Sequence, residues 1–181
     1  MMTPLPVTIG FPQIRRLLAG ELHALIRPLS TTRSRLAKAQ PNGLLWVREP
    51  YCFHRDFDAF SPTVAESLGA RPMFIADLPE DGWPDEGGKA RIAYTLPRAC
   101  HRQHLRIFTV DRRPLHDLGS PAIRAQGFDS LDDWIAAWNR GLQVCGSSRN
   151  RWHDNPDVLC FTIERIDRPI REPAHVEGAS R

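Results

Sequence analysis

The stretch "GLLWVREPY", residues 43–51, begins as a buried strand and then changes character. Residues 44–47 are all apolar, as expected of a strand that is covered on both faces. Arg48 and Glu49 follow at once, and Pro50 cannot donate a hydrogen bond to a strand ladder, so the strand should end there. The polar exit is explained either by an ion pair on the surface or by a functional site at the end of the strand.

The pattern of apolar residues around this stretch predicts a mixed set of elements. The predicted strands are 5–9, 22–27, 44–49, 73–77, 104–112 and 158–166. Helices are predicted from Pro12 to Gly20, from Ser120 as N-cap to Gly127, and from residue 129 or 130. The apolar stripe of the last helix is formed by Leu131, Trp134, Ile135 and Trp138.

The predicted strand 104–112 carries apolar residues on both faces, which is typical of a central strand. One face would hold Leu105, Ile107 and Thr109, and the other Arg106, Phe108 and Val110. With five or six strands and three helices, the sequence indicates an α+β fold with a mostly antiparallel, curled sheet.

The predicted organisation is one domain over residues 1–168, with a long loop insertion around 52–90 and a polar C-terminal tail over 169–181. Within the insertion, "LPEDGWPDEGG" (78–88) is rich in Pro, Gly and acidic residues, and we expect an exposed, mobile loop there. Residues 30–35 also read as a polar loop.

The composition is that of an ordinary soluble protein. The chain has 181 residues, of which 41% are hydrophobic and 25% charged, and no apolar run approaches the roughly 20 residues of a membrane helix. The N-terminus shows no secretory signal pattern, so we expect a cytoplasmic protein. Four cysteines without C-x-x-C spacing are expected to be reduced thiols, namely Cys52, Cys100, Cys145 and Cys160.

The basic residues are almost all arginines. Lys38 and Lys89 are the only lysines, so 22 of the 24 basic residues are Arg, although the net charge is only +3. Arginine suits bidentate recognition of phosphate and base edges. A GC-rich genome would produce the same bias through codon usage.

Seven stretches follow the order of a motif series in a known family. They are "LAGELHALIRPL" (18–29), "NGLLWVREPY" (42–51), "FIAD" (74–77), "LPRACHR" (96–102), "AIRAQGF" (122–128), "AWNRG" (137–141) and "WHDNPDVLCFTIE" (152–164). The series resembles small phage- and prophage-type proteins of the ASCH superfamily, relatives of the PUA-like RNA-binding barrels. The resemblance implies a curled antiparallel β-barrel with flanking helices and a cleft for a base or nucleotide.

The resemblance also bears on activity. Some ASCH proteins look like amidohydrolases that deacetylate acetylated cytidine, and the family pattern places a Lys, a Thr and a Glu where protons are exchanged. Those positions correspond to Leu22, Leu25 and Gln126 in this sequence. Because Leu has no proton to exchange and Gln has no carboxylate, the resemblance predicts that this activity is absent.

The positions that the resemblance keeps are suited to holding a ligand. Guanidinium groups bind phosphates or base edges bidentately, and a Trp face stacks a base with about 1–3 kcal/mol. In the structural alternative, Arg48 and Glu49 pair internally to close the barrel, Trp46 is a core residue and Asn155 is a turn residue. The predicted ligand-binding residues are Arg27, Trp46, Arg48, Glu49, Arg98 and Asn155.

Two other groups of residues carry possible chemistry. Cys100, His101 and His104 offer metal ligands, but their spacing fits no common zinc pattern, and we expect neither a metal nor a cofactor. His23 lies in the segment of the missing Lys and could act as a base near neutral pH.

The sequence therefore predicts a nucleotide- or RNA-binding ASCH-like protein that lacks the amidohydrolase residues and has no membrane contact. Two alternatives stay open. One is a divergent hydrolase of a modified nucleoside or RNA that uses His23 or Glu49. The other is an accessory protein with a vestigial cleft, in which loops such as 78–88 contact a partner. No feature of the sequence indicates the oligomeric state.

Overall fold

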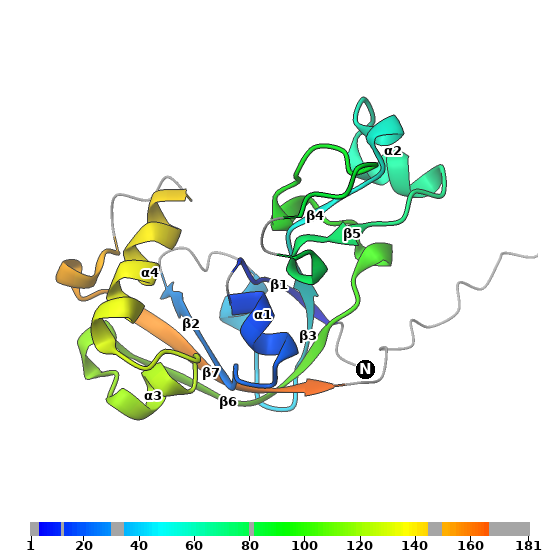
Figure 1. Ribbon diagram of the computed structural model, residues 1–181. Coiled ribbons are helices and arrows are strands. Elements are labelled where there is room, and N and C mark those ends of the chain that lie inside the picture. The colour runs from blue at the N-terminus through cyan, green and yellow to red at the C-terminus, as the bar shows by residue number, and fades with distance from the viewer. Residues whose placement is uncertain (1–3, 12, 30–34, 80–81, 145–149, 167–181) are drawn as a thin grey trace, which may run out of the picture.

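The computed structural model describes residues 4–11, 13–29, 35–79, 82–144 and 150–166. Its helices are short except for the last, and most of its strands belong to one sheet (Figure 1). The strands are β1 (Leu5–Thr8), β2 (Ala24–Pro28), β3 (Leu44–Arg48), β4 (Tyr51–Cys52), β5 (Met73–Phe74), β6 (His104–Pro114) and β7 (Asp157–Ile166). The α-helices are α1 (Gln13–Leu18), α2 (Pro62–Ser67), α3 (Ser120–Arg124) and α4 (Leu131–Val144).

The main sheet has five strands in the order β1-β3-β6-β7-β2. Only β1 and β3 pair in parallel, and the other three pairs are antiparallel. The α+β class and the mostly antiparallel sheet are thus confirmed, and β6 is a central strand as predicted. The short pair β4–β5 forms a second sheet in the insertion.

The sheet is curled but is not a closed barrel, which corrects the expectation from the sequence. Within the described residues, no backbone pairing joins the two edge strands, β1 and β2. A side chain crosses the gap instead: Arg27 on β2 donates through Nη2 to the Thr8 carbonyl on β1 at 2.9 Å, and through Nη1 to the Ile26 carbonyl at 2.8 Å. The edges therefore approach closely without forming a ladder.

Three apolar clusters organise the fold. The largest fills the concave side of the sheet, where Ile14 and Leu17 of α1 pack against inward-facing strand residues (Figure 1). The second lies between the other face of the β2 and β7 side and the helices α3 and α4, with Trp134 at its centre. The third lies in the segment between β3 and β6 and is built around Tyr51 and Phe53. This segment, which contains the predicted insertion, projects from the β3 end of the sheet.

Four local predictions need correction. A β-bulge between Ile107 and Thr109 shifts the register of β6, so Val110 rather than Thr109 faces the concave core. The predicted strand 73–77 pairs only over Met73–Phe74 and then turns into a 3-10 helix, Ile75–Asp77.

Two corrections concern helices. Gly119 is the N-cap of α3, and Ser120 is already inside the helix. Leu131 is 44% exposed and so does not belong to the buried stripe of α4. Residues 30–34 of the predicted polar loop and the predicted tail over 169–181 lie outside the described residues. Among the helices that the structure describes, none combines the length and the apolar character needed to cross a bilayer.

Candidate functional site

The exit of β3 places Arg48 on top of Trp46. The two side chains share one face of the strand because they are two residues apart. The Arg48 guanidinium carbon lies 4.7 Å from the centre of the Trp46 ring, a cation–π contact. Trp46 itself is only 5% exposed. Its role in this structure is thus to support the guanidinium from below.

Two histidines lie near Trp46. The His101 ring centre lies 5.2 Å from that of Trp46, and His104 is the register partner of Trp46 on β6. The two Nε2 atoms of His101 and His104 are 2.7 Å apart, and His101 Nδ1 contacts the Arg98 carbonyl. Burial lowers the pKa of His104, and the neighbouring His101 lowers it further. The histidines thereby fix the segment that carries Arg98 and Arg102.

Glu49, next to Arg48, is the centre of a buried ion pair. Its side chain is 0% exposed, and both carboxylate oxygens accept hydrogen bonds from Arg102 at 2.9 Å. Arg102 also donates to both oxygens of Asp77, at 2.5 and 2.9 Å. One guanidinium thus joins two carboxylates that lie 28 positions apart in the chain, and we call Glu49, Arg102 and Asp77 the carboxylate–guanidinium network.

Arg102 has contacts beyond its two carboxylate partners. The guanidinium carbon lies 4.0 Å from the centre of the Phe74 ring, so an aromatic face covers it as well. Burial alone would lower the pKa of Arg102, but the hydrogen bonds and charges of Glu49 and Asp77 hold that pKa above its ordinary value. Arg102 is therefore always charged, and a charged Arg102 needs its two carboxylates in place.

Residues 48–50 hold two separate segments of the chain. The Arg48 carbonyl accepts from the Ile9 amide at 2.9 Å, which fixes the segment leading to α1. The Pro50 carbonyl accepts from the Ile75 amide at 3.1 Å, and Glu49 fixes Asp77 through Arg102. The polar exit of β3 thus positions residues 9–11 on one side and 75–79 on the other.

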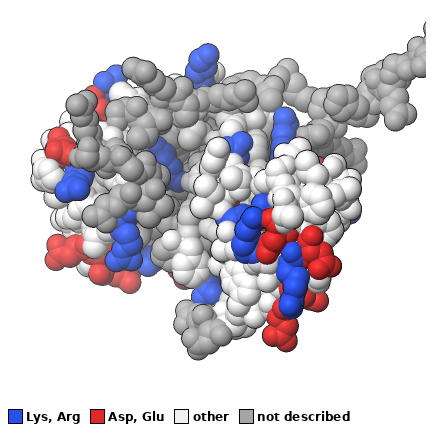
Figure 2. Space-filling view, turned by 90° about the horizontal axis from the view of Figure 1, so that it is seen from above, with Lys and Arg blue, Asp and Glu red and all other residues white. Residues whose placement is uncertain are grey.

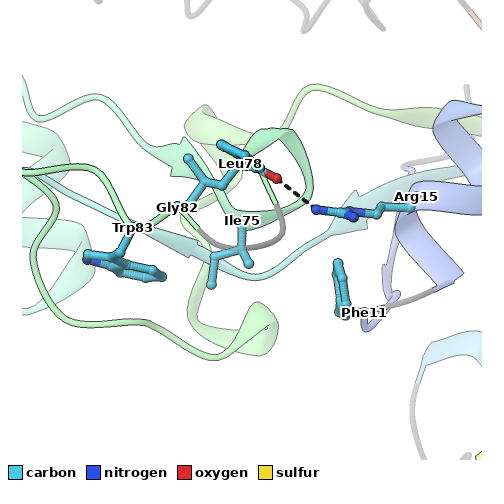
Figure 3. A pocket seen from close by; sticks show the side chains of 7 residues that line it. Phe11, Arg15, Ile75, Leu78, Gly82 and Trp83 are labelled. Atoms are coloured by element: carbon cyan, nitrogen blue, oxygen red, sulfur yellow. Dashed lines mark hydrogen bonds between the residues drawn. The ribbon is translucent and has the colours of Figure 1, made fainter.

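A cavity of about 520 Å³ lies between these two segments. It is lined by Phe11, Arg15, Ile75, Leu78, Pro79, Gly82 and Trp83. Figure 3 shows Phe11 and Arg15 on one side, and Ile75, Leu78, Gly82 and Trp83 on the other. Arg15 crosses between the sides and donates to the Leu78 carbonyl at 2.7 Å, and its guanidinium carbon lies 4.8 Å from the Phe11 ring centre. The volume is in the range of small-molecule sites.

The predicted site residues lie in three places. Arg27, Trp46, Arg48 and Glu49 are near the ends of β1 and β3, since the Thr8 that binds Arg27 is the register partner of Arg48. Arg98 is exposed and begins the short 3-10 helix Arg98–Cys100.

Asn155 lies elsewhere, in a left-handed turn (φ 43°) after Asp154, where its Oδ1 accepts from the His116 amide at 2.8 Å. None of the six predicted residues lines the cavity. Their contact with a ligand therefore stays a prediction.

Sequence reasoning missed two members of the carboxylate–guanidinium network and the residues that line the cavity. Arg102 and Asp77 stood in the quoted stretches "LPRACHR" and "FIAD", so their motif positions were a usable signal. Phe11 and Trp83 are 52% and 46% exposed and lie outside any regular element, where no periodicity marks them.

The positions that correspond to the amidohydrolase residues are buried. Leu22 and Leu25 are 3% and 0% exposed and belong to the concave core. Gln126 is 2% exposed, and its Oε1 accepts from Gln13 at 3.4 Å. His23 is exposed. This region therefore holds apolar packing and amides in place of a proton-exchanging set.

Metal ligands and cysteines give no further site. Within the described ranges, no three His, Cys, Asp or Glu side chains gather closely enough to hold a metal ion. Of the four cysteines, Cys52, Cys100 and Cys160 are free, and Cys145 lies outside the described residues. Burial raises the pKa of each of the three thiols, which disfavours the reactive thiolate.

Charges of both signs are interspersed on the upper face of the molecule. Figure 2 shows blue and red side chains next to each other on both sides of this face, with uncharged residues between them. Among the described residues seen there, no broad basic patch is formed.

Comparison with known proteins supports the fold. No family model matches the sequence, and no curated protein matches it. A crystal structure of a protein from Enterococcus faecalis V583, described by the family model DUF984, is similar with a TM-score of 0.51 at 11% identity, over 97% of this chain and 88% of that chain. An ASCH domain from Lactobacillus crispatus JV V101 gives a TM-score of 0.42 at 12% identity, over 83% of this chain and 67% of that chain. The chain thus shares the fold of the Enterococcus protein.

Proposed function

We propose that this chain is a cytoplasmic, ASCH-like protein that binds a nucleotide or an RNA element without amidohydrolase activity. The observation that carries the proposal is the arrangement at the ends of β1 and β3. There the Arg48 guanidinium stands on the Trp46 ring, and Arg27 binds the Thr8 carbonyl beside it. Guanidinium groups held on a rigid support are well suited to bind phosphate.

The other predicted residues take supporting roles in this proposal. Arg98 is exposed, and its backbone carbonyl contacts His101, whose ring packs on Trp46; in this proposal it supplies a further cation. Glu49 acts through Arg102, because both of its oxygens already accept from that guanidinium. Asn155 holds its turn through His116.

The hydrolase alternative has less support. Glu49 would have to leave Arg102 before it could take a proton, and such a buried pair is costly to break. His23 is exposed, and its backbone amide donates to the Ala125 carbonyl at 2.6 Å. The engagement of Glu49 by Arg102 therefore favours binding over hydrolysis in this proposal.

The test measures RNA binding by fluorescence anisotropy with labelled single-stranded 12-mers at several salt concentrations. For single strands, each phosphate contact contributes about 0.7 to the slope of log K against log salt. Arg48→Ala should weaken binding of all sequences similarly and lower this slope by about 0.7.

Arg140→Ala, which removes an exposed arginine on α4, is the matched control. Arg48→Lys keeps the charge and should retain part of the affinity, which separates charge loss from misfolding. Equal binding by Arg48→Ala and Arg140→Ala, or no binding of RNA and nucleotides by the wild type, would overturn the proposal.

A further inference from the structure

The cavity next to the proposed phosphate contacts has the chemistry of an aromatic binding site. Among the described residues, Arg15 is its only charged lining side chain. Ile75, Leu78 and Pro79 form an apolar wall. Phe11 and Trp83 expose 52% and 46% of their surface. Half-exposed rings in a concave site are the usual platform on which nucleic-acid bases stack.

Trp83 is held in position by its own loop. Its Nε1 donates to the Gly87 carbonyl at 3.2 Å, and a Cβ on Gly87 would lie only 2.8 Å from that nitrogen, so glycine allows the close approach. The loop is fastened further on, because the Gly88 amide donates to the Phe53 carbonyl at 2.8 Å. These hydrogen bonds position the Trp83 ring at the cavity.

The other parts of the cavity lining are also held by hydrogen bonds. Phe11 follows Ile9, whose amide is bound to Arg48, and the wall that contains Ile75 is bound to Pro50. Arg15 then links the walls through the Leu78 carbonyl (Figure 3). A cavity with fixed walls binds without the cost of ordering them.

We infer that this cavity receives the base of the ligand, with the base in contact with the partly exposed side chains of Phe11 and Trp83. This inference rests on the proposed function. It assigns the base of the nucleotide to the cavity and its phosphate to the end of β3. Arg15 is the one charged lining side chain among the described residues, and it already donates to the Leu78 carbonyl at 2.7 Å. The rest of the described lining is uncharged and mostly apolar, which favours a base over a phosphate there. The phosphate stays outside, at the end of β3 near Arg48.

The experiment compares ligands with and without a base. The full chain is titrated by calorimetry with AMP, GMP, CMP, UMP and pyrophosphate, in the wild type and in Trp83→Ala, Phe11→Ala and Phe108→Ala. Phe108 is 46% exposed on β6, which makes its variant a matched control for loss of an exposed ring.

Trp83→Ala and Phe11→Ala should each weaken mononucleotide binding about 5- to 150-fold, the effect of one lost stacking contact. Pyrophosphate binding and the Phe108→Ala variant should be unchanged. Trp83→Phe keeps a ring and should bind within a few-fold of the wild type, while the part of the nucleotide-dependent fluorescence change that comes from Trp83 is lost.

Two other results are distinguishable. If mononucleotides and pyrophosphate bind equally well and Trp83→Ala changes neither, the inference is wrong while the proposed function stands. If neither mononucleotides nor RNA bind the wild type, the proposed function fails, and the inference fails with it.

Discussion

Glu49→Gln should destabilise the protein far more than Asp77→Asn, although both carboxylates bind the same guanidinium. Glu49 is 0% exposed, whereas Asp77 is 50% exposed. Removing one partner of a buried ion pair costs about 3–5 kcal/mol. Because Arg102 is 27% exposed and keeps Asp77, we expect a smaller loss for Glu49→Gln, about 2–3 kcal/mol. Asp77→Asn removes a half-exposed pair and should cost about 1 kcal/mol or less.

Urea unfolding, followed by circular dichroism, measures this difference. With a slope of about 2 kcal/mol per molar urea, Glu49→Gln should lower the midpoint by about 1–1.5 M and Asp77→Asn by at most about 0.5 M. Glu86→Gln, at an exposed carboxylate of the insertion, serves as the control and should leave the midpoint unchanged.

The slope itself should stay the same in all three variants, since the same surface is exposed on unfolding. Equal midpoint shifts for Glu49→Gln and Asp77→Asn would refute the reasoning, because burial of one carboxylate is its only basis. A shift below about 0.5 M for Glu49→Gln would do the same.

Two more predictions concern pH and backbone conformation. The free energy of unfolding should fall as pH drops below about 6.5, because unfolded His104 then binds a proton that burial disfavours in the folded chain. Urea midpoints at pH 7.5 and 5.5 should differ less in His104→Gln, and an unchanged difference would contradict the assignment. Gly127→Ala should lower the thermal midpoint more than Gly20→Ala. Both glycines have a positive φ (79° and 78°). Of the two, only Gly127 would bring an added Cβ against another side chain, that of Arg16, at 2.7 Å. The shared left-handed backbone costs about 1–2 kcal/mol, so equal losses would show that the Arg16 contact adds nothing.

Local patterns predicted the elements that build the sheet. The apolar run before Arg48 forms β3, because a buried strand needs apolar residues. The segment before Gly20 forms α1, because a glycine in the left-handed conformation is a common helix end. The faces of β6 could not be read in the same way. The bulge at residues 107–109 inserts one position, and its cause lies in the pairing with β7, which is distant in the chain.

The candidate site was predictable only at the strand exit. The sequence places two charged residues, Arg48 and Glu49, at the end of β3. It does not show that the partner of Glu49 is Arg102, which lies 53 positions later. The cavity combines Phe11 with Trp83, and no periodicity links two loop residues so far apart. Such a site is formed by residues that meet only in the folded structure. The local spacing of residues in one sequence does not predict which distant residues meet.

The pairing of β2 with β7 affects how the chain folds during synthesis. Pro28 pairs with Val158, so the partner of β2 leaves the ribosome 130 residues later. At about 5–20 residues per second, β2 waits roughly 7–26 s for its only neighbour in the sheet. During this time Leu25 and Ile26, which end up on opposite faces of the finished sheet, stay uncovered by β7. β2 thus depends on a strand that is made much later, and the sheet is completed only after β7 has been synthesised.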